Sequence, residues 1–202
     1  MTSQDATRPS SRERLLDATV ELVRTKGPAA SGTKEILARA DAPRGSFYFH
    51  FPAGKDQLVA AAVARAAAAT AAALAAALED RSRALPERIA KFIEAVGVAL
   101  ATDDYRLGCA VAATVLETSA TSPALRRATE TAFGSWAAVL TEHLAGAGLA
   151  PDRAAALADC VIAGLEGATL LARARRDTAP LEHVAAMLAA MLAAELPLPS
   201  AR

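Results

Sequence analysis

The chain has 202 residues, 53% of them hydrophobic and 4% aromatic, which is enough to bury the core of one large domain or two small ones. Its formal net charge is zero, which excludes a uniformly basic chain. Alanine supplies more than a quarter of the residues, with runs at 66–69 and, interrupted by Leu74, at 71–77, and no strand-like alternation of convincing length occurs. We therefore expect an all-α protein.

Charge is distributed unevenly along the chain. Residues 8–55 contain nine Lys or Arg against five acidic residues, a net charge of +4, so the remainder carries −4. Such asymmetry is what a face for DNA or another anionic ligand at one end would produce. Scatter over a solvated surface is the alternative interpretation.

We next consider a signal peptide, a membrane span and the two cysteines. Residues 1–9 are polar and have no apolar core, so we expect no signal peptide. Arg65 and Thr70 interrupt the alanine-rich stretches, so we expect no membrane span. Cys109 and Cys160 have no metal-ligand spacing, and we predict a reduced, cytoplasmic protein without a metal or cofactor.

The first predicted helix begins with a capping box. Ser10 stands at the N-cap and Glu13 three residues later, ahead of apolar residues at helical spacing. Gly27-Pro28 is expected to end this helix. The apolar face comprises Leu15, Leu16, Thr19, Leu22 and Val23.

Two short helices follow in close succession. One is expected from near Ser31 to about Ala40, and Asp41 with Ala42 makes a tight turn. Pro43 suits the first turn of the next helix, which stops before residues 52–54. This is the helix-turn-helix arrangement, whose second helix enters the major groove of DNA.

The side chains of the second short helix suit that role. Arg44 and Tyr48 project together, whereas Phe47 and Phe51 repeat at i, i+4 on another face. The two phenylalanines are the expected anchors. Arginine matches guanine edges and phosphates, and Ser or Tyr hydroxyls suit phosphate oxygens.

Residues 11–60 resemble the N-terminal domain of TetR-type transcriptional regulators. The resemblance is carried by Gly45-Ser46-Phe47-Tyr48-Phe49-His50-Phe51 and Lys55-Asp56-Gln57-Leu58. The sequences Pro52-Ala53-Gly54-Lys55, Ser31-Gly32-Thr33 and Gly108-Cys109-Ala110-Val111-Ala112 are similar to the LmrA-like subgroup. Asp41 replaces the usual turn glycine, and aspartate tolerates the left-handed region. The predicted DNA contacts are Ser31, Thr33, Lys34, Arg44, Gly45, Ser46, Tyr48, His50 and Lys55.

About nine helices are expected in total. We predict a helix-turn-helix DNA-binding domain over residues 1–55 and a helical effector-binding and dimerisation domain over residues 56–202. The later helices are expected near 54–78, 86–102, 105–118, 123–145, 151–175 and 180–195.

The last two helices carry heptad-like apolar seams. Their small residues, such as Gly164 and Gly167, would let another helix approach closely. Packing on the subunit's own core is the alternative, but the family resemblance implies a dimer held by these two helices. The seams comprise Leu157, Val161, Gly164, Ala168, Leu171, Leu181, Val184, Leu188 and Met191.

The second half could enclose a largely apolar pocket with a few polar groups. The resemblance implies a small hydrophobic or aromatic effector, although aromatic residues at helical spacing are more often core. The candidate effector-binding residues are Phe92, Val96, Cys109, Leu116, Glu117, Phe133, Trp136, Leu140, Glu166 and Leu170.

No catalytic residues are predicted. His143 and His183 stand alone near helix ends, and His50 is a better candidate for a phosphate contact than for chemistry. The resemblance implies a repressor that binds palindromic double-stranded operator DNA as a homodimer and leaves it when an effector binds. The alternative is an all-α small-molecule-binding protein or enzyme that does not read DNA.

Overall fold

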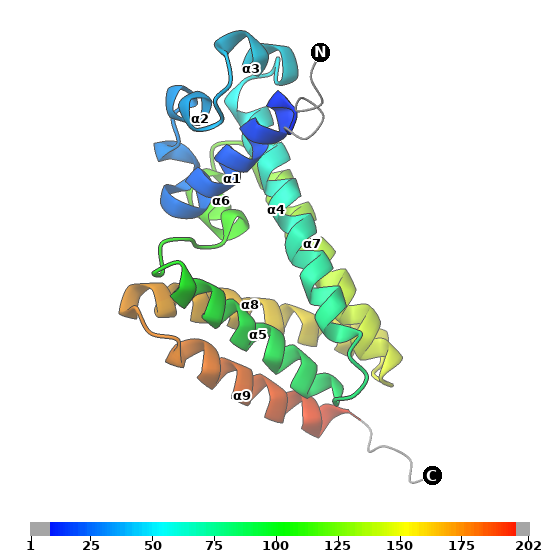
Figure 1. Cartoon of the computed structure of the whole chain (residues 1–202). Coiled ribbons are helices and arrows are strands. Elements are labelled where there is room, and N and C mark those ends of the chain that lie inside the picture. Colours follow the sequence, from blue (N-terminus) through cyan, green and yellow to red (C-terminus); the bar gives the residue numbers. More distant parts are fainter. Residues whose placement is uncertain (1–8, 197–202) are drawn as a thin grey trace, which may run out of the picture. The chain divides into compact units, whose positions relative to one another are not determined.

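A computed structural model describes residues 9–196, and within that range the chain forms nine helices and no strand (Figure 1). The all-α prediction is therefore confirmed. The helices are α1 (Ser11–Ala30), α2 (Thr33–Arg39), α3 (Arg44–His50), α4 (Lys55–Leu78), α5 (Leu85–Thr102), α6 (Ala110–Thr118), α7 (Pro123–Gly146), α8 (Pro151–Arg175) and α9 (Ala179–Glu195).

The helices pack as two compact units. Of the described residues, the first unit contains those up to Ala66 together with Ala110–Glu130, and the second contains Ala67–Cys109 and those from Thr131 onward. Helix α6 thus packs with the N-terminal helices, against α1, although it lies beyond residue 55. The functional boundary between residues 1–55 and 56–202 stays a prediction, because packing units and functional domains are different divisions.

The first unit is built on the apolar face of α1. Ser10 Oγ accepts a hydrogen bond from the Glu13 N–H at 3.2 Å, and Glu13 Oε2 accepts one from the Ser10 N–H at 2.8 Å, which confirms the capping box. The hydrogen bond from the Ser10 backbone lowers the pKa of the exposed Glu13 carboxyl. The face of α1 packs against α2, α3 and the start of α4 through buried Leu15, Leu16, Leu22, Ile36, Phe47, Phe51 and Leu58.

Helix α1 is broken near its end rather than terminated. Gly27 has a φ of 79° and a ψ of 166°, a non-helical conformation that interrupts the helix. Pro28 then starts one further turn, which runs to Ala30. The predicted stop at residues 27–28 is therefore a kink, with both residues buried.

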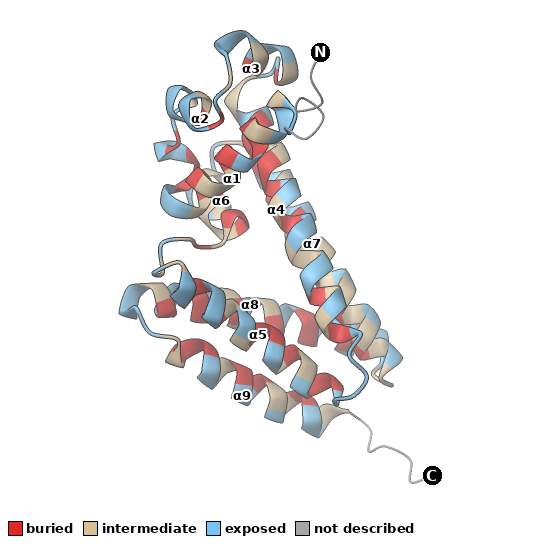
Figure 2. Ribbon diagram, viewed as in Figure 1, coloured by how far each residue is buried: buried red, intermediate tan, exposed pale blue. Residues whose placement is uncertain are grey.

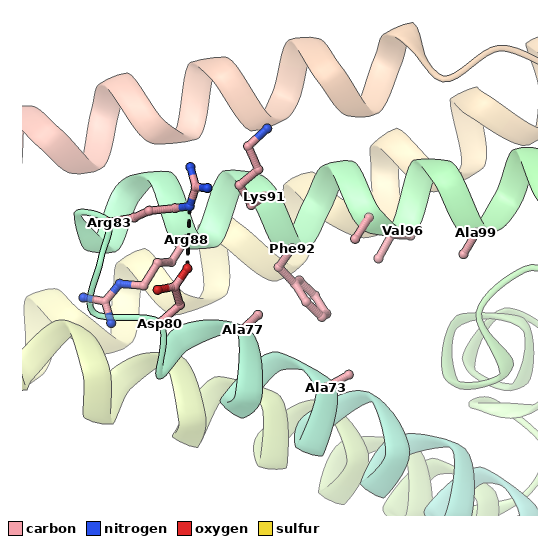
Figure 3. A pocket seen from close by; sticks show the side chains of 10 residues that line it. Ala73, Ala77, Asp80, Arg83, Arg88, Lys91, Phe92, Val96 and Ala99 are labelled. Atoms are coloured by element: carbon pink, nitrogen blue, oxygen red, sulfur yellow. Dashed lines mark ion pairs between the residues drawn. The ribbon is translucent and has the colours of Figure 1, made fainter.

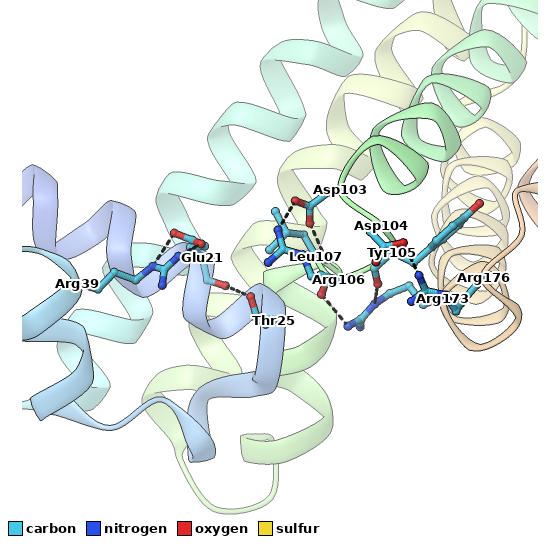
Figure 4. Close-up of polar contacts among 10 residues, drawn as sticks. All are labelled: Glu21, Thr25, Arg39, Asp103, Asp104, Tyr105, Arg106, Leu107, Arg173 and Arg176. Atoms are coloured by element: carbon cyan, nitrogen blue, oxygen red, sulfur yellow. Dashed lines mark hydrogen bonds and ion pairs between the residues drawn. The ribbon is translucent and has the colours of Figure 1, made fainter.

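Helix α6 begins five residues later than the sequence pattern predicts, at Ala110 instead of about Tyr105. Tyr105 takes a left-handed φ of 58°. Its carbonyl accepts a hydrogen bond from Arg173 Nε of α8 at 3.3 Å, and Asp103 Oδ2 accepts one from the Leu107 N–H at 3.1 Å (Figure 4). These side-chain contacts hold the segment before α6 outside the helix.

In the second unit, α5, α8 and α9 lie side by side, with their buried residues on the facing sides (Figure 2). Added to Gly164, a Cβ atom would meet Val184 at 3.1 Å and Leu188 at 3.2 Å, so α8 and α9 approach closely within one subunit. The buried core of this layer includes Ile89, Ile93, Leu157, Ala158, Leu181 and Leu192.

The predicted seams on α8 and α9 need a correction. Most of their residues are buried in the subunit itself, because the two helices pack against each other and against α5. The large apolar residues left exposed on these helices are Leu170, Leu171 and Met187. The buried seam residues are Leu157, Val161, Ala168, Leu181 and Leu188.

Helices α4 and α8 are long and apolar enough, by length and composition, to cross a membrane. In their most apolar stretches, 33% of α4 and 39% of α8 is buried in the structure, and core helices of soluble proteins pass the same test. The expectation of no membrane span stays a prediction.

Candidate nucleic-acid interface

The turn between α2 and α3 is closed by a side chain from α1. Asp41 has a φ of 45°, the left-handed conformation that the sequence requires in place of glycine. Arg14 donates hydrogen bonds from Nε to the carbonyl of Ala40 at 2.9 Å and from Nη2 to the carbonyl of Asp41 at 3.0 Å. Arg14 could not be picked out from the sequence, in which its only distinguishing feature is its position just before the apolar face of α1.

Helix α3 is anchored by its aromatic residues. Phe47 and Phe51 are 3% and 1% exposed, in agreement with the predicted anchors, and their rings lie 6.2 Å apart. The guanidinium of Arg12 lies 5.8 Å from the centre of the Phe51 ring. Pro43 is the N-cap, one residue before the first turn in which it was predicted.

The opposite face of α3 is open to solvent. Arg44 is exposed and makes no ion pair with any described residue, and the Tyr48 side chain is 53% exposed. An added Cβ at Gly45 would meet nothing within 4 Å. The fold therefore leaves a cation, a phenol and a bare stretch of backbone together on a surface, groups that suit phosphate and base edges.

Phe49 belongs to this surface, although sequence analysis left it out. It is 80% exposed and lies beside His50, with the ring centres 5.0 Å apart. The aromatic run from Phe47 to Phe51 indicates this exposure. Only the i, i+4 pair, Phe47 and Phe51, can face the core, so Phe49 between them must face elsewhere. An exposed Phe suits contact with a thymine methyl group.

Two other predicted contacts are half-buried. His50 Nε2 lies 3.0 Å from Ser11 Oγ, so α1 orients the imidazole. Ser46 is half-buried within the first turn of α3. Ser11 is a second residue that sequence analysis missed, and its capping-box position gave no indication of this contact.

The predicted contacts at and just before α2 differ in how far they are exposed. Lys34 is exposed and makes no ion pair with any described residue, and Thr33 is half-buried at the first position of the helix. Ser31 is fully buried, and its hydroxyl donates a hydrogen bond to the Gly27 carbonyl at 2.6 Å. Ser31 is therefore buried inside the kink of α1, where its hydroxyl is already hydrogen bonded. Its side chain is not accessible for the predicted DNA contact.

Several basic residues of the N-terminal region are paired within the protein. Arg39 Nε donates to Glu21 Oε2 at 2.7 Å (Figure 4), and this bond raises the pKa of the Arg39 guanidinium. Lys26 pairs with Glu35. The cationic character of this surface therefore rests on fewer residues than the charge count indicates.

The start of α4 is held by neighbouring segments. Lys55 is half-buried, and its Nζ lies 3.4 Å from the Ala29 carbonyl. Asp56 Oδ2 accepts a hydrogen bond from Ser122 Oγ at 2.7 Å. The ammonium thus lies at the N-terminus of a long helix, where it and the free backbone N–H groups favour a phosphate.

Glu117, predicted as an effector contact, links α6 to α1 instead. Its Oε2 accepts a hydrogen bond from the Ala29 N–H at 2.7 Å. Its carboxylate also fills the space beside Gly27, where an added Cβ would overlap it. A glycine with positive φ is therefore required here both by the backbone and by the close approach of Glu117.

The remaining effector candidates divide into separate groups. Phe92 and Val96 line a cavity between α4 and α5 of about 440 Å³ (Figure 3). Trp136 is 3% exposed and donates from Nε1 to the Ala67 carbonyl at 2.9 Å, with Phe133 packed edge-on against it at 5.3 Å. Leu140 is buried on the same helix.

Cys109 and Glu166 lie together. The two side chains are hydrogen bonded, and burial of Glu166 raises the pKa of its carboxyl. Glu166 Oε2 is buried without a hydrogen-bond partner among the described residues. Leu116 and Leu170, in contrast, are 72% and 48% exposed, so the structure does not bring all predicted effector residues into one site.

The chain is similar to known bacterial regulators over most of its length. Residues 15–62 match the family profile described as bacterial regulatory proteins, tetR family, and residues 86–187 match the C-terminal domain of LmrA/YxaF-like transcriptional regulators. It is 36% identical over 192 residues to the HTH-type transcriptional regulator Rv0196 of Mycobacterium tuberculosis (strain ATCC 25618 / H37Rv), covering 92% of this chain and 96% of that protein.

Two further similarities cover comparable lengths. The chain is 31% identical over 182 residues to the HTH-type transcriptional regulator LmrA of Bacillus subtilis (strain 168), covering 90% of this chain and 96% of that protein. The crystal structure of regulatory protein TetR from Rhodobacter sphaeroides superposes with a TM-score of 0.79 at 27% identity, covering 89% of this chain and 97% of that chain.

Proposed function

Since the chain belongs to the TetR family of bacterial transcriptional regulators and carries the LmrA/YxaF-like C-terminal domain, we propose that it is a homodimeric repressor released from a palindromic operator by a small effector. It is a regulator and not an enzyme. The observation that carries the proposal is the unpaired, exposed face of α3, which is held in place by buried Phe47 and Phe51.

DNA binding is proposed to centre on this face. Arg44, Tyr48 and Phe49 reach base edges or phosphates in the major groove, and Gly45 allows close approach of the backbone. Thr33, Lys34, Ser46, His50 and Lys55 contact the flanking phosphates. A two-fold dimer presents two such helices about one helical turn of DNA apart, roughly 34 Å, which matches a palindrome.

Dimerisation is proposed through the outer faces of α8 and α9. Leu170, Leu171 and Met187 are exposed there, and large apolar residues at helical surfaces favour association.

Repression is consistent with a more distant relative, described as the HTH-type transcriptional repressor DhaR of Mycobacterium sp. (strain GP1), which is 26% identical over 180 residues. The protein would act in the cytoplasm, where its operator lies.

Release is proposed to follow from binding of a small hydrophobic or aromatic effector in the second unit. The cavity lined by Phe92 and Val96 and the half-buried Cys109–Glu166 pair supply apolar and polar contacts. To weaken operator binding a hundredfold, the effector must favour the DNA-incompetent state by about 2.7 kcal/mol, an ordinary allosteric coupling.

Fluorescence anisotropy with the DNA upstream of its own gene tests the proposal. We expect specific binding with a steep salt dependence, and we expect Arg44→Ala combined with Tyr48→Phe to weaken it at least a hundredfold while the circular dichroism spectrum is unchanged. Arg81→Ala is the matched control, because Arg81 is an exposed cation in the link between α4 and α5, outside α3 and outside the proposed dimer faces. Binding that survives the double substitution would refute the assignment of α3 as the reading helix.

A further inference from the structure

The cavity between α4 and α5 joins an apolar floor to a cationic end (Figure 3). Ala73 and Ala77 of α4 face Phe92 and Val96 of α5 across a space of about 440 Å³. That volume lies within the range of roughly 300–1,000 Å³ that is typical of small-molecule sites. The small alanine side chains leave room for an apolar body between the helices.

Charge at the end of the cavity is unbalanced. Three cations, Arg83, Arg88 and Lys91, line it together with one acid, Asp80. Arg83 Nε lies 3.6 Å from Asp80 Oδ2, and Lys91 Nζ pairs at 2.6 Å with the exposed Glu94. Such surface pairs contribute little to stability, so a ligand carboxylate can replace either acid.

Arg88 is the cation whose contacts indicate a ligand. Its Nη1 donates to the carbonyl of Leu78, the last residue of α4, which fixes the guanidinium. Its Nε is buried and has no hydrogen-bond partner among the described residues. A buried donor without a partner is unfavourable, and an acceptor supplied from outside would satisfy it.

We propose that this cavity binds a small amphipathic carboxylate, with its apolar body along the alanines and Phe92 and its carboxylate at Arg88. This deepens the function proposed above and rests on it, because it names the chemical class of the effector. A neutral alcohol with the same apolar body can accept a hydrogen bond from Arg88 Nε but carries no charge to match the positive end of the cavity, and a cationic analogue is repelled by that end. Discrimination should therefore follow charge rather than hydrophobicity.

The test uses the full-length protein and three probes with the same ten-carbon chain: decanoate, decanol and decylamine. Isothermal titration calorimetry should show decanoate binding at least tenfold more tightly than either analogue. Equal affinity for decanoate and decanol would overturn the role of the carboxylate.

Two variants locate the site. Arg88→Gln should weaken decanoate binding at least tenfold, with Arg127→Gln, at an exposed cation of α7 outside the cavity, as the control. Because Arg88 also contacts the end of α4, Ala95→Phe provides a second route: Ala95 is exposed and lines the cavity, so a ring there fills the cavity without disturbing the core. Ala76→Phe, at an exposed α4 position outside the cavity, is its control. Undiminished binding in both Arg88→Gln and Ala95→Phe would overturn the site.

Operator binding separates this inference from the proposed function. Saturating decanoate should lower operator affinity at least tenfold in the unmodified protein and have no effect on Ala95→Phe. Decanoate bound with operator affinity unchanged would overturn its role as the effector while the carboxylate site stands. Failure to bind the operator without any ligand would instead contradict the proposed function.

Discussion

Gly45 is unusual among the residues of α3 because nothing in the protein requires it. It lies inside a helix, its φ is not positive, and an added Cβ would enter open space. Glycine in a helix interior destabilises the fold by about 0.5–1 kcal/mol relative to alanine. Nothing within the described chain accounts for this cost, and we propose that glycine here allows close approach of a DNA backbone.

We predict that Gly45→Ala raises thermal stability and weakens operator binding at least tenfold. Removal of the glycine should stabilise α3 by about 0.5–1 kcal/mol, seen as a higher Tm, while the new methyl group meets the DNA. Gly134→Ala is the matched control, because Gly134 is an exposed helical glycine of α7 with equally open surroundings. A Gly45→Ala protein with unchanged operator affinity would contradict this explanation.

The buried carboxyl of Glu166 predicts a pH dependence of stability. Burial raises its pKa in the folded state above the ordinary glutamate value of 4.5, so the folded protein holds the proton more tightly than the unfolded chain. Stability from this group is therefore present below pH 4.5 and is lost as the pH rises through the folded pKa. The hydrogen bond with Cys109 lowers the pKa of the Glu166 carboxyl, but this effect is smaller than the increase caused by burial.

We expect Glu166→Gln to be more stable than the unmodified protein at pH 7.5 and to lose that advantage at pH 4. Urea unfolding at the two pH values measures the difference. Glu142→Gln, an exposed acid on α7, should show no such dependence. A Glu166→Gln advantage that stayed constant with pH would mean that the carboxyl does not titrate between these values.

Residues whose contacts depend on neighbours close in the sequence could be predicted. Phe47 and Phe51 follow from i, i+4 spacing, and the capping box of Ser10 follows from adjacent residues. Ser31 was not predictable in the same way. Its hydroxyl bonds to a carbonyl that is available only because α1 kinks at Gly27, and no periodicity records that geometry.

At the scale of elements, the contact between α6 and α1 is the main departure from expectation. Glu117 looked like a pocket residue because a carboxylate among apolar helical residues needs a partner, and its partner proved to be the Ala29 N–H. The late start of α6 has a similar cause, since Arg173 of α8 holds the preceding segment. Tertiary hydrogen bonds of this kind overrode the local helical pattern.

The kink of α1 predicts strong coupling between Gly27 and Glu117. Gly27→Ala should destabilise the fold by about 1–3 kcal/mol from the backbone alone, because φ 79° with ψ 166° is a conformation essentially restricted to glycine, with an added penalty from overlap with the carboxylate. In a Glu117→Ala background that added penalty disappears. A double-mutant cycle by urea unfolding at fixed protein concentration should therefore give a coupling of about 0.5–3 kcal/mol. Strictly additive effects would show that the carboxylate does not fill this space in solution.

For the whole molecule, net charge was less informative than its distribution. The N-terminal excess of +4 predicted a face for an anion, yet Arg39, Lys26 and Arg14 are committed to internal contacts. Lys34 and Arg44 remain exposed and free of ion pairs with the described residues. The proposed operator affinity therefore depends on two copies of a modest cationic surface, which makes dimerisation essential to it.

The dimer surface gives the prediction at this scale. Leu171→Glu combined with Met187→Glu places two charges per subunit on the exposed faces of α8 and α9, where a two-fold contact would bury them in pairs. We expect the variant to be monomeric by light scattering and to bind the operator at least a hundredfold more weakly, because each subunit then engages one half-site alone.

Val98→Glu is the matched control, since Val98 is 66% exposed on α5 of the same unit and should tolerate a charge without change of mass or operator affinity. Circular dichroism of both variants checks that the helices are retained. A double variant that stayed dimeric would move the interface away from these faces of α8 and α9. A monomer that still bound the operator normally would instead remove the reason for a two-fold arrangement, because one α3 would then suffice for recognition.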